Sequence, residues 1–315
     1  MGSAIVAAAA LAGIARADGL PVLGVDVGPV GVVSHNGEAR YVTLPDGIET
    51  VVARVRTDGG RVVASAVVDG SFTIPAVAYD GSASGLSADG STLVLIEPRA
   101  AFPRPETTLK ILHARGLRTR SVVRLRGDFS VDAISPHGSS LYLIQYTSRT
   151  DPTRYRVRVY DVDAGRLLAA PIVDPHERDE QMRGSPLSRA TSPDGRWTYT
   201  LYDGAGGTPF VHALDTVRRT ARCIDLDTLR GNSYLWRLRL NVHGSRLTVR
   251  DGHETEAVVN LRTFRVGKPD ETMLGFGWWP AAAAALLVAA ALGVSGAVVR
   301  RGLRRPCLRP LARRR

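Results

Sequence analysis

One short turn recurs along this chain at a spacing of roughly 50 residues, and it limits the fold more than any other feature. Four segments align without gaps around the turn. Each has an alternating apolar stretch, a polar turn that ends in glycine, and a second alternating stretch. Apolar residues at every second position predict strands, and the polar turns predict antiparallel hairpins. The segments are Ser84–Ile96, Asp132–Ile144, Arg189–Leu201 and Leu238–Arg250.

Glycine ends every one of these turns because the backbone there needs a positive φ, which glycine adopts without strain. A weaker fifth copy in Val33–Leu44 is centred on Gly37. The glycines of the four clear copies are Gly90, Gly138, Gly195 and Gly244.

A second hairpin follows each turn, and it is clearest in Tyr155–Val173 and Phe210–Leu226 and recurs in Leu109–Leu125 and Glu256–Val266. Four strands in about 40 to 50 residues are typical of a propeller blade. Blades stacked side by side bury sheet faces that a single sheet leaves exposed. We therefore expect an all-β propeller of about five or six four-stranded blades. The sixth would lie in Ile48–Asp80, where the sequence predicts another hairpin.

The Ser-Pro-Asp-Gly turn at Ser192–Gly195 resembles the blades of the YVTN, TolB and WD40-like (PD40-type) bacterial propellers. Ser135–Gly138 has a histidine in place of the acid, and Ser87–Gly90 has an alanine in place of the proline. The resemblance covers roughly residues 33–268. No unit ends in Trp-Asp, so a true WD40 repeat is not supported.

Two further segments, Gly206–Thr216 and Ala221–Leu226, resemble membrane-anchored propeller proteins of actinobacteria whose function is unknown. The arginine-rich composition, with lysine only at Lys110 and Lys268, agrees with a high-GC bacterial genome. A resemblance of this kind implies a fold but no activity.

The C-terminal end predicts a membrane anchor. Residues 275–299 are apolar and uncharged, and about 20 such residues cross a bilayer as a helix. Residues 300–315 hold eight arginines and no acid, which is typical of a cytoplasmic flank. We expect one transmembrane helix over 275–299, with Trp278 and Trp279 at its outer interface, and a cytoplasmic tail over 300–315. A buried helix of a soluble protein is the alternative.

Small residues recur every four positions in the same apolar run, at Ala289, Gly293 and Ala297. That spacing lets two membrane helices approach closely, so a helix-mediated dimer is a further hypothesis.

The N-terminal end predicts a secretory signal peptide over residues 1–17. Its apolar run, residues 4–14, is followed by Ala15-Arg16-Ala17, which fits a cleavage site, although no basic residue precedes the run. An alanine-rich helix of the domain is the alternative. Residues 18–270 would then form an extracytoplasmic domain tethered to the cell membrane.

The formal charge of +11 does not indicate a nucleic-acid partner. Eight of the 41 basic residues lie in the tail over 300–315, and the rest of the chain is close to balance with 30 acidic residues. Phosphate binding would need a basic cluster within the folded part.

Seven histidines are spread singly, without the spacing of a metal site. Cys223, predicted to be a buried apolar residue, and Cys307 would lie on opposite sides of the membrane and could not pair. The positions in equivalent turns predict that His137 and His243 are turn residues, and the alternating strand around His212 predicts a packed side chain. The histidines are His35, His113, His137, His176, His212, His243 and His253.

Four carboxylates crowd into Asp174–Glu180. They could hold a hard cation through oxygen ligands, but the segment lacks the glycine and spacing of a calcium loop, so we interpret it as a solvated loop between blades. Asp203–Gly207 is glycine-rich but lies between two strands, which predicts a hairpin loop rather than an anion site.

These patterns predict no catalytic, cofactor-binding or metal-binding residue. Neither a Gly-x-Ser-x-Gly turn nor a phosphate-binding Gly-Lys-Ser/Thr loop occurs. We interpret the chain as a membrane-anchored binding or sensing module that contacts an envelope protein or a small ligand through its propeller loops. The alternative is a lactonase-like propeller hydrolase. Its site would need at least three His, Asp or Glu side chains converging at the mouth of the central channel.

Overall fold

The computed structural model describes residues 31–177 and 182–267, and these residues form an all-β body. Within these ranges the chain folds into five antiparallel sheets, of which four have four strands and one has three. In every sheet, neighbouring strands are consecutive in the sequence, so each sheet is a simple meander. This is the arrangement that the repeated hairpins predict.

The five sheets follow one another along the chain. The first sheet consists of β1 (Val32–Val33), β2 (Ala39–Asp46), β3 (Glu49–Arg56) and β4 (Val62–Asp69), and the second of β5 (Thr92–Ile96), β6 (Glu106–His113) and β7 (Arg118–Arg126). The third sheet consists of β8 (Phe129–Ile134), β9 (Ser140–Tyr146), β10 (Tyr155–Asp161) and β11 (Arg166–Leu167). The fourth sheet consists of β12 (Pro186–Thr191), β13 (Trp197–Tyr202), β14 (Phe210–Asp215) and β15 (Thr220–Asp225), and the fifth of β16 (Arg239–His243), β17 (Arg246–Asp251), β18 (Glu254–Asn260) and β19 (Val266–Gly267).

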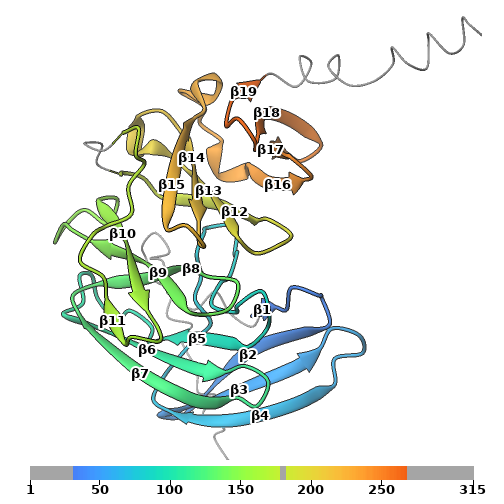
Figure 1. Ribbon diagram of the computed structural model, residues 1–315, viewed down its shortest axis with the longest axis vertical. Coiled ribbons are helices and arrows are strands. Elements are labelled where there is room, and N and C mark those ends of the chain that lie inside the picture. Colours follow the sequence, from blue (N-terminus) through green and yellow to red (C-terminus); the bar gives the residue numbers. More distant parts are fainter. Residues whose placement is uncertain (1–30, 178–181, 268–315) are drawn as a thin grey trace, which may run out of the picture. The chain divides into compact units, whose positions relative to one another are not determined.

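The first strand of a sheet lies on the inside of the body, and the later strands lie farther out. Figure 1 shows β1, β5, β8 and β12 on the inner side, with β4 and β7 at the periphery. In the second sheet the innermost position is filled by an irregular segment that pairs through a single bridge, Leu86 with Leu93. A side chain at Gly85 in this segment would lie 2.6 Å from the carbonyl oxygen of Val94, so glycine is required there.

Four of the recurring turns have the same hydrogen bonds, and we call them the inner turns: Ser34–Gly37, Ser87–Gly90, Ser135–Gly138 and Ser192–Gly195. In each, the glycine N–H donates to the carbonyl oxygen of the serine, at 2.8–2.9 Å. The serine Oγ accepts the N–H of the residue five positions later, at 2.9–3.0 Å. Each glycine has a φ between 66° and 73°. The prediction of one repeated turn is confirmed, including its weaker copy at Gly37.

The fifth sheet turns differently, so the prediction of the same four-residue turn at Gly244 is wrong, and His243, predicted to be a turn residue, is the last residue of β16. β16 and β17 are joined by only Gly244 and Ser245, and His243 pairs directly with Arg246. Asn241 occupies the position of the serine, so the serine-based hydrogen bonds of the inner turns are not formed here. Gly244 still has a positive φ of 56°.

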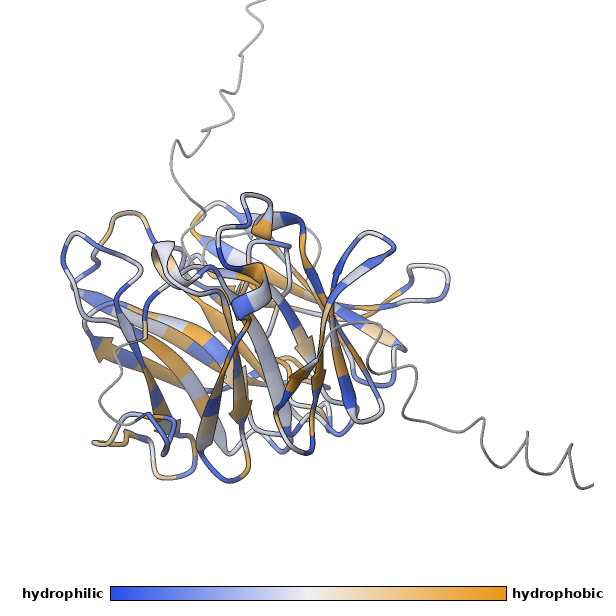
Figure 2. Ribbon diagram, turned by 90° about the horizontal axis from the view of Figure 1, so that it is seen from above, coloured by the Kyte–Doolittle hydropathy of each residue, from blue (hydrophilic) through white to orange (hydrophobic). Residues whose placement is uncertain are grey.

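The core consists of four apolar layers, each between two consecutive sheets. β5 shows how the layers arise, because all five of its residues are buried. Leu93 and Leu95 pack toward the first sheet, whereas Val94 and Ile96 pack toward the third. Figure 2 shows the apolar residues along the strands and the hydrophilic residues in the connecting loops. Period-two alternation thus supplies a buried face to each of two neighbours.

One expectation about the number of units is wrong. The hairpin predicted in Ile48–Asp80 is β3 and β4, the outer half of the first sheet, and it does not begin a sixth unit. The described part of the chain therefore has five sheets. The hairpin loop predicted over Asp203–Gly207 is confirmed between β13 and β14, where Gly204–Gly206 form a short 3₁₀ turn, η1.

None of the helices in the described ranges is long and apolar enough to cross a membrane. The predicted signal peptide over 1–17 and transmembrane helix over 275–299 lie outside the described residues.

Candidate functional site

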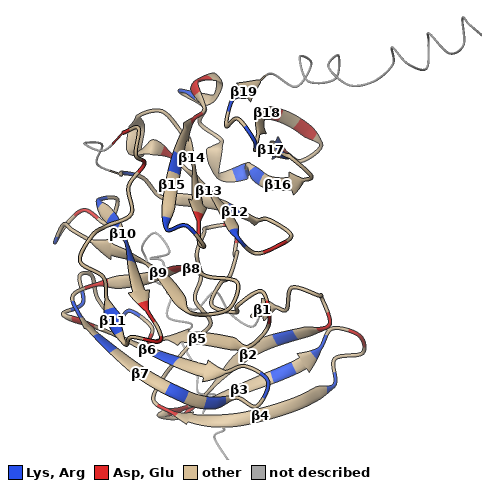
Figure 3. Cartoon of the chain, viewed as in Figure 1, with Lys and Arg blue, Asp and Glu red and all other residues tan. Residues whose placement is uncertain are grey.

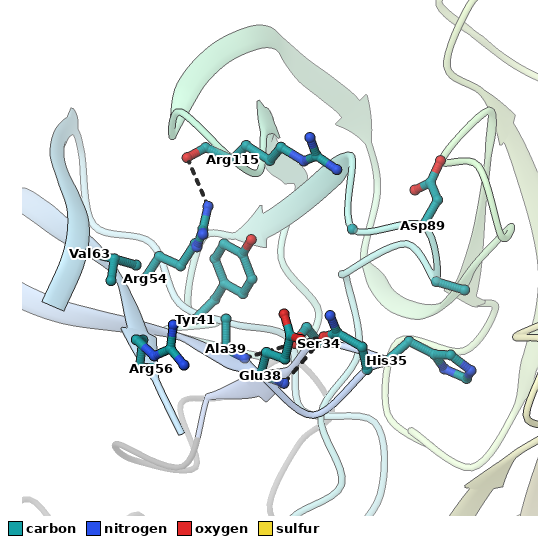
Figure 4. Close-up of a pocket in the computed structure, with 13 residues that line it drawn as sticks. Ser34, His35, Glu38, Ala39, Tyr41, Arg54, Arg56, Val63, Asp89 and Arg115 are labelled. Carbon is teal, nitrogen blue, oxygen red and sulfur yellow. Dashed lines mark hydrogen bonds between the residues drawn. The ribbon is translucent and has the colours of Figure 1, made fainter. Parts of the chain in front are cut away.

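One pocket of the described residues lies between the first and second sheets, at the end of the body where the inner turns are found. Its volume is about 430 Å³, a size suited to a small metabolite. Figure 4 shows the side chains that surround it. We call it the basic pocket, and it is lined by Ser34, His35, Asn36, Glu38, Ala39, Tyr41, Arg54, Arg56, Val63, Ala88, Asp89, Gly90 and Arg115.

The alternation of β3 places two arginines in this wall. Val52, Arg54 and Arg56 point to the same side of the sheet, toward the second sheet. Val52 is fully buried in the layer between the two sheets, Arg54 is half-buried and Arg56 is exposed. The face of β3 thus changes from core to pocket wall over four residues.

Two guanidinium groups of the pocket are not neutralised by carboxylates among the described residues. Arg54 donates from Nη1 to the carbonyl oxygen of Arg115 at 3.4 Å, and its buried Nε has no hydrogen-bond partner there. The Arg115 side chain makes no hydrogen bond or ion pair within the described ranges. Arg56 differs, because Asp58 holds it through two hydrogen bonds of 2.6 and 2.8 Å.

Tyr41 stands between these two arginines, with its ring on β2 and its hydroxyl directed into the space that they border (Figure 4). Burial raises the pKa of Tyr41, and the charges of Arg54 and Arg115 only partly oppose that rise. The phenol therefore stays protonated at neutral pH and can donate a hydrogen bond. Together the three side chains form a cluster of donors that suits an anionic group.

The opposite wall carries acceptors. Asp89 belongs to an inner turn, where its Oδ1 accepts from Ser87 Oγ at 2.6 Å and from the Ser91 N–H at 2.9 Å. Burial acts to raise the pKa of Asp89, but hydrogen bonds from Ser87, Ser91 and His137 outweigh it and hold the pKa below its ordinary value. Asp89 is thus ionised and fixed in place. Glu38, which directly precedes β2 in the first sheet, adds a second, exposed carboxylate on the side of Ser34 and Ala39 (Figure 4).

The inner turns meet one another at this end of the body. The Asp89 N–H donates to the carbonyl oxygen of Pro136 at 3.0 Å, and His35 Nε2 contacts the carbonyl oxygen of Pro193. A side chain at Gly195 would collide with Ala88. Below these contacts a smaller cavity of about 170 Å³ lies among the innermost segments of the first four sheets, and its lining is apolar and hydroxylic except for His35.

This central cavity gives little support to a catalytic centre. His137 Nδ1 lies 3.3 Å from Asp89 Oδ2, but His137 is largely exposed and both residues belong to the turns. Asp194 binds Ser192 Oγ and the Arg196 N–H within its own turn, as Asp89 does. The prediction that His137 lies in a turn is confirmed.

Among the described residues, one group of three potential ligand atoms lies within 4.8 Å, and it is remote in sequence from the inner turns: Asp174, Glu177 and Cys223. Asp174 is buried and accepts the N–H groups of His176 and Cys223, both at 2.9 Å. Arg222 Nε lies 3.7 Å from the same carboxylate. A guanidinium next to this buried carboxylate already balances its charge, so the arrangement fits a structural anchor better than a cation site.

Two expectations about this region need correction. Asp174 is buried and bonds to β15, so the segment is not simply a solvated loop; Asp179 and Glu180 lie outside the described residues. Cys223 is half-buried rather than fully buried, because it borders a surface pocket formed by the fourth sheet and the segment that precedes it.

The histidines separate into one buried and six exposed residues. His212 is 1% exposed, which confirms that its side chain is packed. Burial lowers its pKa to about 4, while Asp132 acts in the opposite direction and Arg189 in the same direction. His212 is therefore neutral at physiological pH.

Sequence reasoning did not single out Tyr41, Arg54 or Arg115. The one signal was the alternation of valine and arginine in Val51–Arg56, which marks a strand whose face carries charge. With 41 basic residues in the chain, that signal does not stand out from the composition.

No protein-family model matches the sequence, and comparison with curated proteins finds no match. Similar solved structures include the hydrazine synthase of Kuenenia stuttgartiensis, 16% identical over 78% of this chain and 81% of that chain, with a TM-score of 0.42. A putative TolB from Agrobacterium tumefaciens is 15% identical over 75% of this chain and 78% of that one, with a TM-score of 0.40.

The β-propeller domain of Cps50 (Swd1) from Myceliophteria thermophila is 12% identical over 70% of this chain and 62% of that chain, with a TM-score of 0.40. Likenesses of this degree concern the fold alone. The all-β architecture of successive antiparallel sheets is shown by the strand order of this chain itself.

Proposed function

We propose that this protein is a binding module, and that its basic pocket takes a small polar ligand bearing a carboxylate or phosphate group. The observation that carries the proposal is the pair of guanidinium groups, Arg54 and Arg115, which face a neutral Tyr41 hydroxyl without a carboxylate partner among the described residues. Arginine binds such oxyanions through planar, charge-assisted hydrogen bonds. Glu38 and Asp89, from two different sides of the pocket, would accept hydrogen bonds from hydroxyl or amino groups of the ligand.

The alternative, a hydrolase with its site at the central cavity, has less support. The hydroxyls of Ser87 and Ser192 donate to the carboxylates of Asp89 and Asp194 within their own turns, and no hydroxyl of the described inner turns is hydrogen-bonded to a histidine. The hydroxyl of Ser34 in the basic pocket donates to Asn36 Oδ1, at 2.8 Å, rather than to a histidine.

The test is a calorimetric titration of the full chain, in detergent, with citrate and with inorganic phosphate. We expect binding by at least one of these anions, and a loss of about tenfold to a hundredfold in affinity on Arg115→Gln, since a hydrogen bond to a charged group contributes about 1.5–3 kcal/mol. Arg124→Gln is the matched control, because Arg124 is exposed on β7 outside the pocket. Equal affinity of the two variants would contradict the proposal.

We also propose that the module is held at the outer face of the cell membrane by a helix over residues 275–299, with residues 300–315 in the cytoplasm. The support is the sequence alone, an uncharged apolar run followed by eight arginines. Full-length protein should stay in the membrane pellet after carbonate extraction, and a chain ending at residue 270 should not. A membrane-impermeant thiol reagent should fail to label Cys307 in intact cells. Labelling of Cys307 would reverse the orientation.

A further inference from the structure

The first sheet has a row of exposed aliphatic residues on the side away from the second sheet. Because Tyr41 and Val52 pack toward the second sheet, alternation turns their neighbours the other way. Among these, Leu44 is 48% exposed and Val67 is 57% exposed, and the two flank Val51 in the register of the sheet. We call this surface the outer face of the first sheet; it carries Val33, Val42, Leu44, Val51, Val55 and Val67, with the polar residues Arg40, Glu49 and Ser65 beside them.

The chain enters the first sheet on this same side. Gly31 has a φ of 62°, and a side chain there would collide first with the carbonyl oxygen of Tyr41 and then, at 2.8 Å, with Cγ1 of Val42, a residue of the outer face. The backbone at Gly31 thus passes close against the outer face, and only glycine fits the space. The residues that precede Gly31 are attached at the border of the uncovered apolar surface.

The sequence before Gly31 has the pattern of a strand with one apolar side. Leu23, Val25 and Val27 alternate with Gly24, Asp26 and Gly28. In an extended chain the first three share one side and the small or acidic residues share the other. This is the pattern required of a segment that lies on an apolar surface with its second side in water.

We propose that residues 20–27 of this chain cover the outer face of the first sheet and serve as its own cap in place of a sixth sheet. The reach suffices, because the four strands span about 14 Å at about 4.8 Å per step. Six extended residues before Gly31 span about 20 Å. Attachment to the sheet also gives the segment a high effective concentration at this surface.

A second copy of the chain is a poorer occupant. A stable interface buries about 800 Å² on each partner. The outer face offers six aliphatic side chains, and Val42, Val51 and Val55 among them are already partly covered. A short segment matches a surface of this size, whereas a stable dimer needs a larger one.

Cysteine cross-linking tests the proposal in the full chain with Cys223→Ser and Cys307→Ser as background. Val25→Cys combined with Val67→Cys should form an intrachain disulfide under mild oxidation, identified by peptide mapping. The matched control combines Val25→Cys with Thr248→Cys on the fifth sheet, and its yield should be at least fivefold lower. Equal yields would overturn the proposal. A predominant disulfide that joins position 67 of one chain to position 67 of a second chain would overturn it as well.

A second measurement does not depend on cysteine chemistry. Leu23→Ser, Val25→Ser and Val27→Ser together should speed amide hydrogen exchange in β2 and β4 by at least tenfold, while β16 and β17 remain unchanged. Asp26→Ser, on the other side of the segment, should leave all four strands unaffected. Unaltered exchange in β4 of the triple variant would contradict the docking of this segment.

Discussion

The two terminal sheets of the body differ on the faces that have no neighbouring sheet among the described residues. The first sheet presents mainly aliphatic side chains on that face, with Arg40 and Glu49 among them, whereas the fifth presents Arg239, Asn241 and Thr248. The one apolar residue of the outer face of the fifth sheet, Val258, is 7% exposed. Figure 3 shows basic residues on β16 and β17. A polar outer face is what the last unit of a stacked array needs for solubility.

This difference separates the roles of the two sheets. Among the described residues, the fifth sheet is the last of the stack and covers its outer face mainly with polar side chains. The first sheet supplies Tyr41 and Arg54 to the basic pocket from its inner side and exposes an apolar surface on its outer side. We infer that both binding events proposed for the described body, of ligand and of chain segment, involve the first sheet.

The largest expected effect compares the two faces of the fifth sheet. Leu247 is fully buried against the fourth sheet, so Leu247→Ala should lower the free energy of unfolding by about 2–5 kcal/mol. Its neighbour on the outer face, Thr248, should tolerate Thr248→Ala within about 0.5 kcal/mol. Urea denaturation of the full chain measures both. Similar losses for the two variants would show that the outer face is also buried.

A pH dependence comes next, and it concerns a junction between sheets rather than an outer face. The folded pKa of His212 is about 4, below the ordinary 6.5, so the unfolded chain binds more protons between these values. Stability should therefore fall as the pH drops from about 6.5 toward 4, by on the order of 2 kcal/mol at pH 5. His212→Leu should remove this part of the dependence. If the free energy of unfolding of the unsubstituted chain and of His212→Leu depended on pH in the same way, His212 would not be buried in its neutral form.

A smaller effect is expected on the outer face of the first sheet. If residues 20–27 cover Leu44, then Leu44→Ser should cost about 1–2 kcal/mol, because a partly exposed leucine loses buried apolar area. An uncovered leucine at this position would give a change near zero. Denaturation of the full chain and of the variant with serine at positions 23, 25 and 27 distinguishes the two cases, since the cost should disappear in the second background.

The smallest effect is expected for Arg239→Gln on the outer face of the fifth sheet. Arg239 is exposed and bonds only to nearby carbonyl groups, of Trp236 and Leu238. Its replacement should change the free energy of unfolding by less than about 0.5 kcal/mol. A larger loss in the same denaturation assay would mean that this face, too, has a partner.

Local patterns predicted the strands and turns well. The serine and glycine of Ser192–Gly195 fix a hydrogen-bonded turn by short-range chemistry, so the sequence alone could place it and its copies. The unit count was less accessible, because the hairpin in Ile48–Asp80 completes the first sheet through its pairing with β2. Local alternation predicts that a segment is a strand, but it does not show which other strand the segment pairs with.

The basic pocket was out of reach for the same reason. Arg54 and Arg115 lie about sixty residues apart and meet only because β3 and the β6–β7 turn reach the same end of the body. For Asp174 the prediction failed in another way, because the run of carboxylates in Asp174–Glu180 predicted an exposed side chain and Asp174 is buried. The buried N–H groups that Asp174 satisfies come from β15 and from its own loop.

Hydrogen exchange of the full chain, with and without saturating citrate or phosphate, tests the central claim most directly. Binding in the basic pocket should slow exchange in residues 33–41, 51–57 and 113–118, and should leave β16 and β17 unchanged. Arg115→Gln should abolish this protection. Protection confined to the turns at residues 135–138 and 192–195, around the central cavity, or no protection by either anion, would contradict the assignment of this pocket as the binding site.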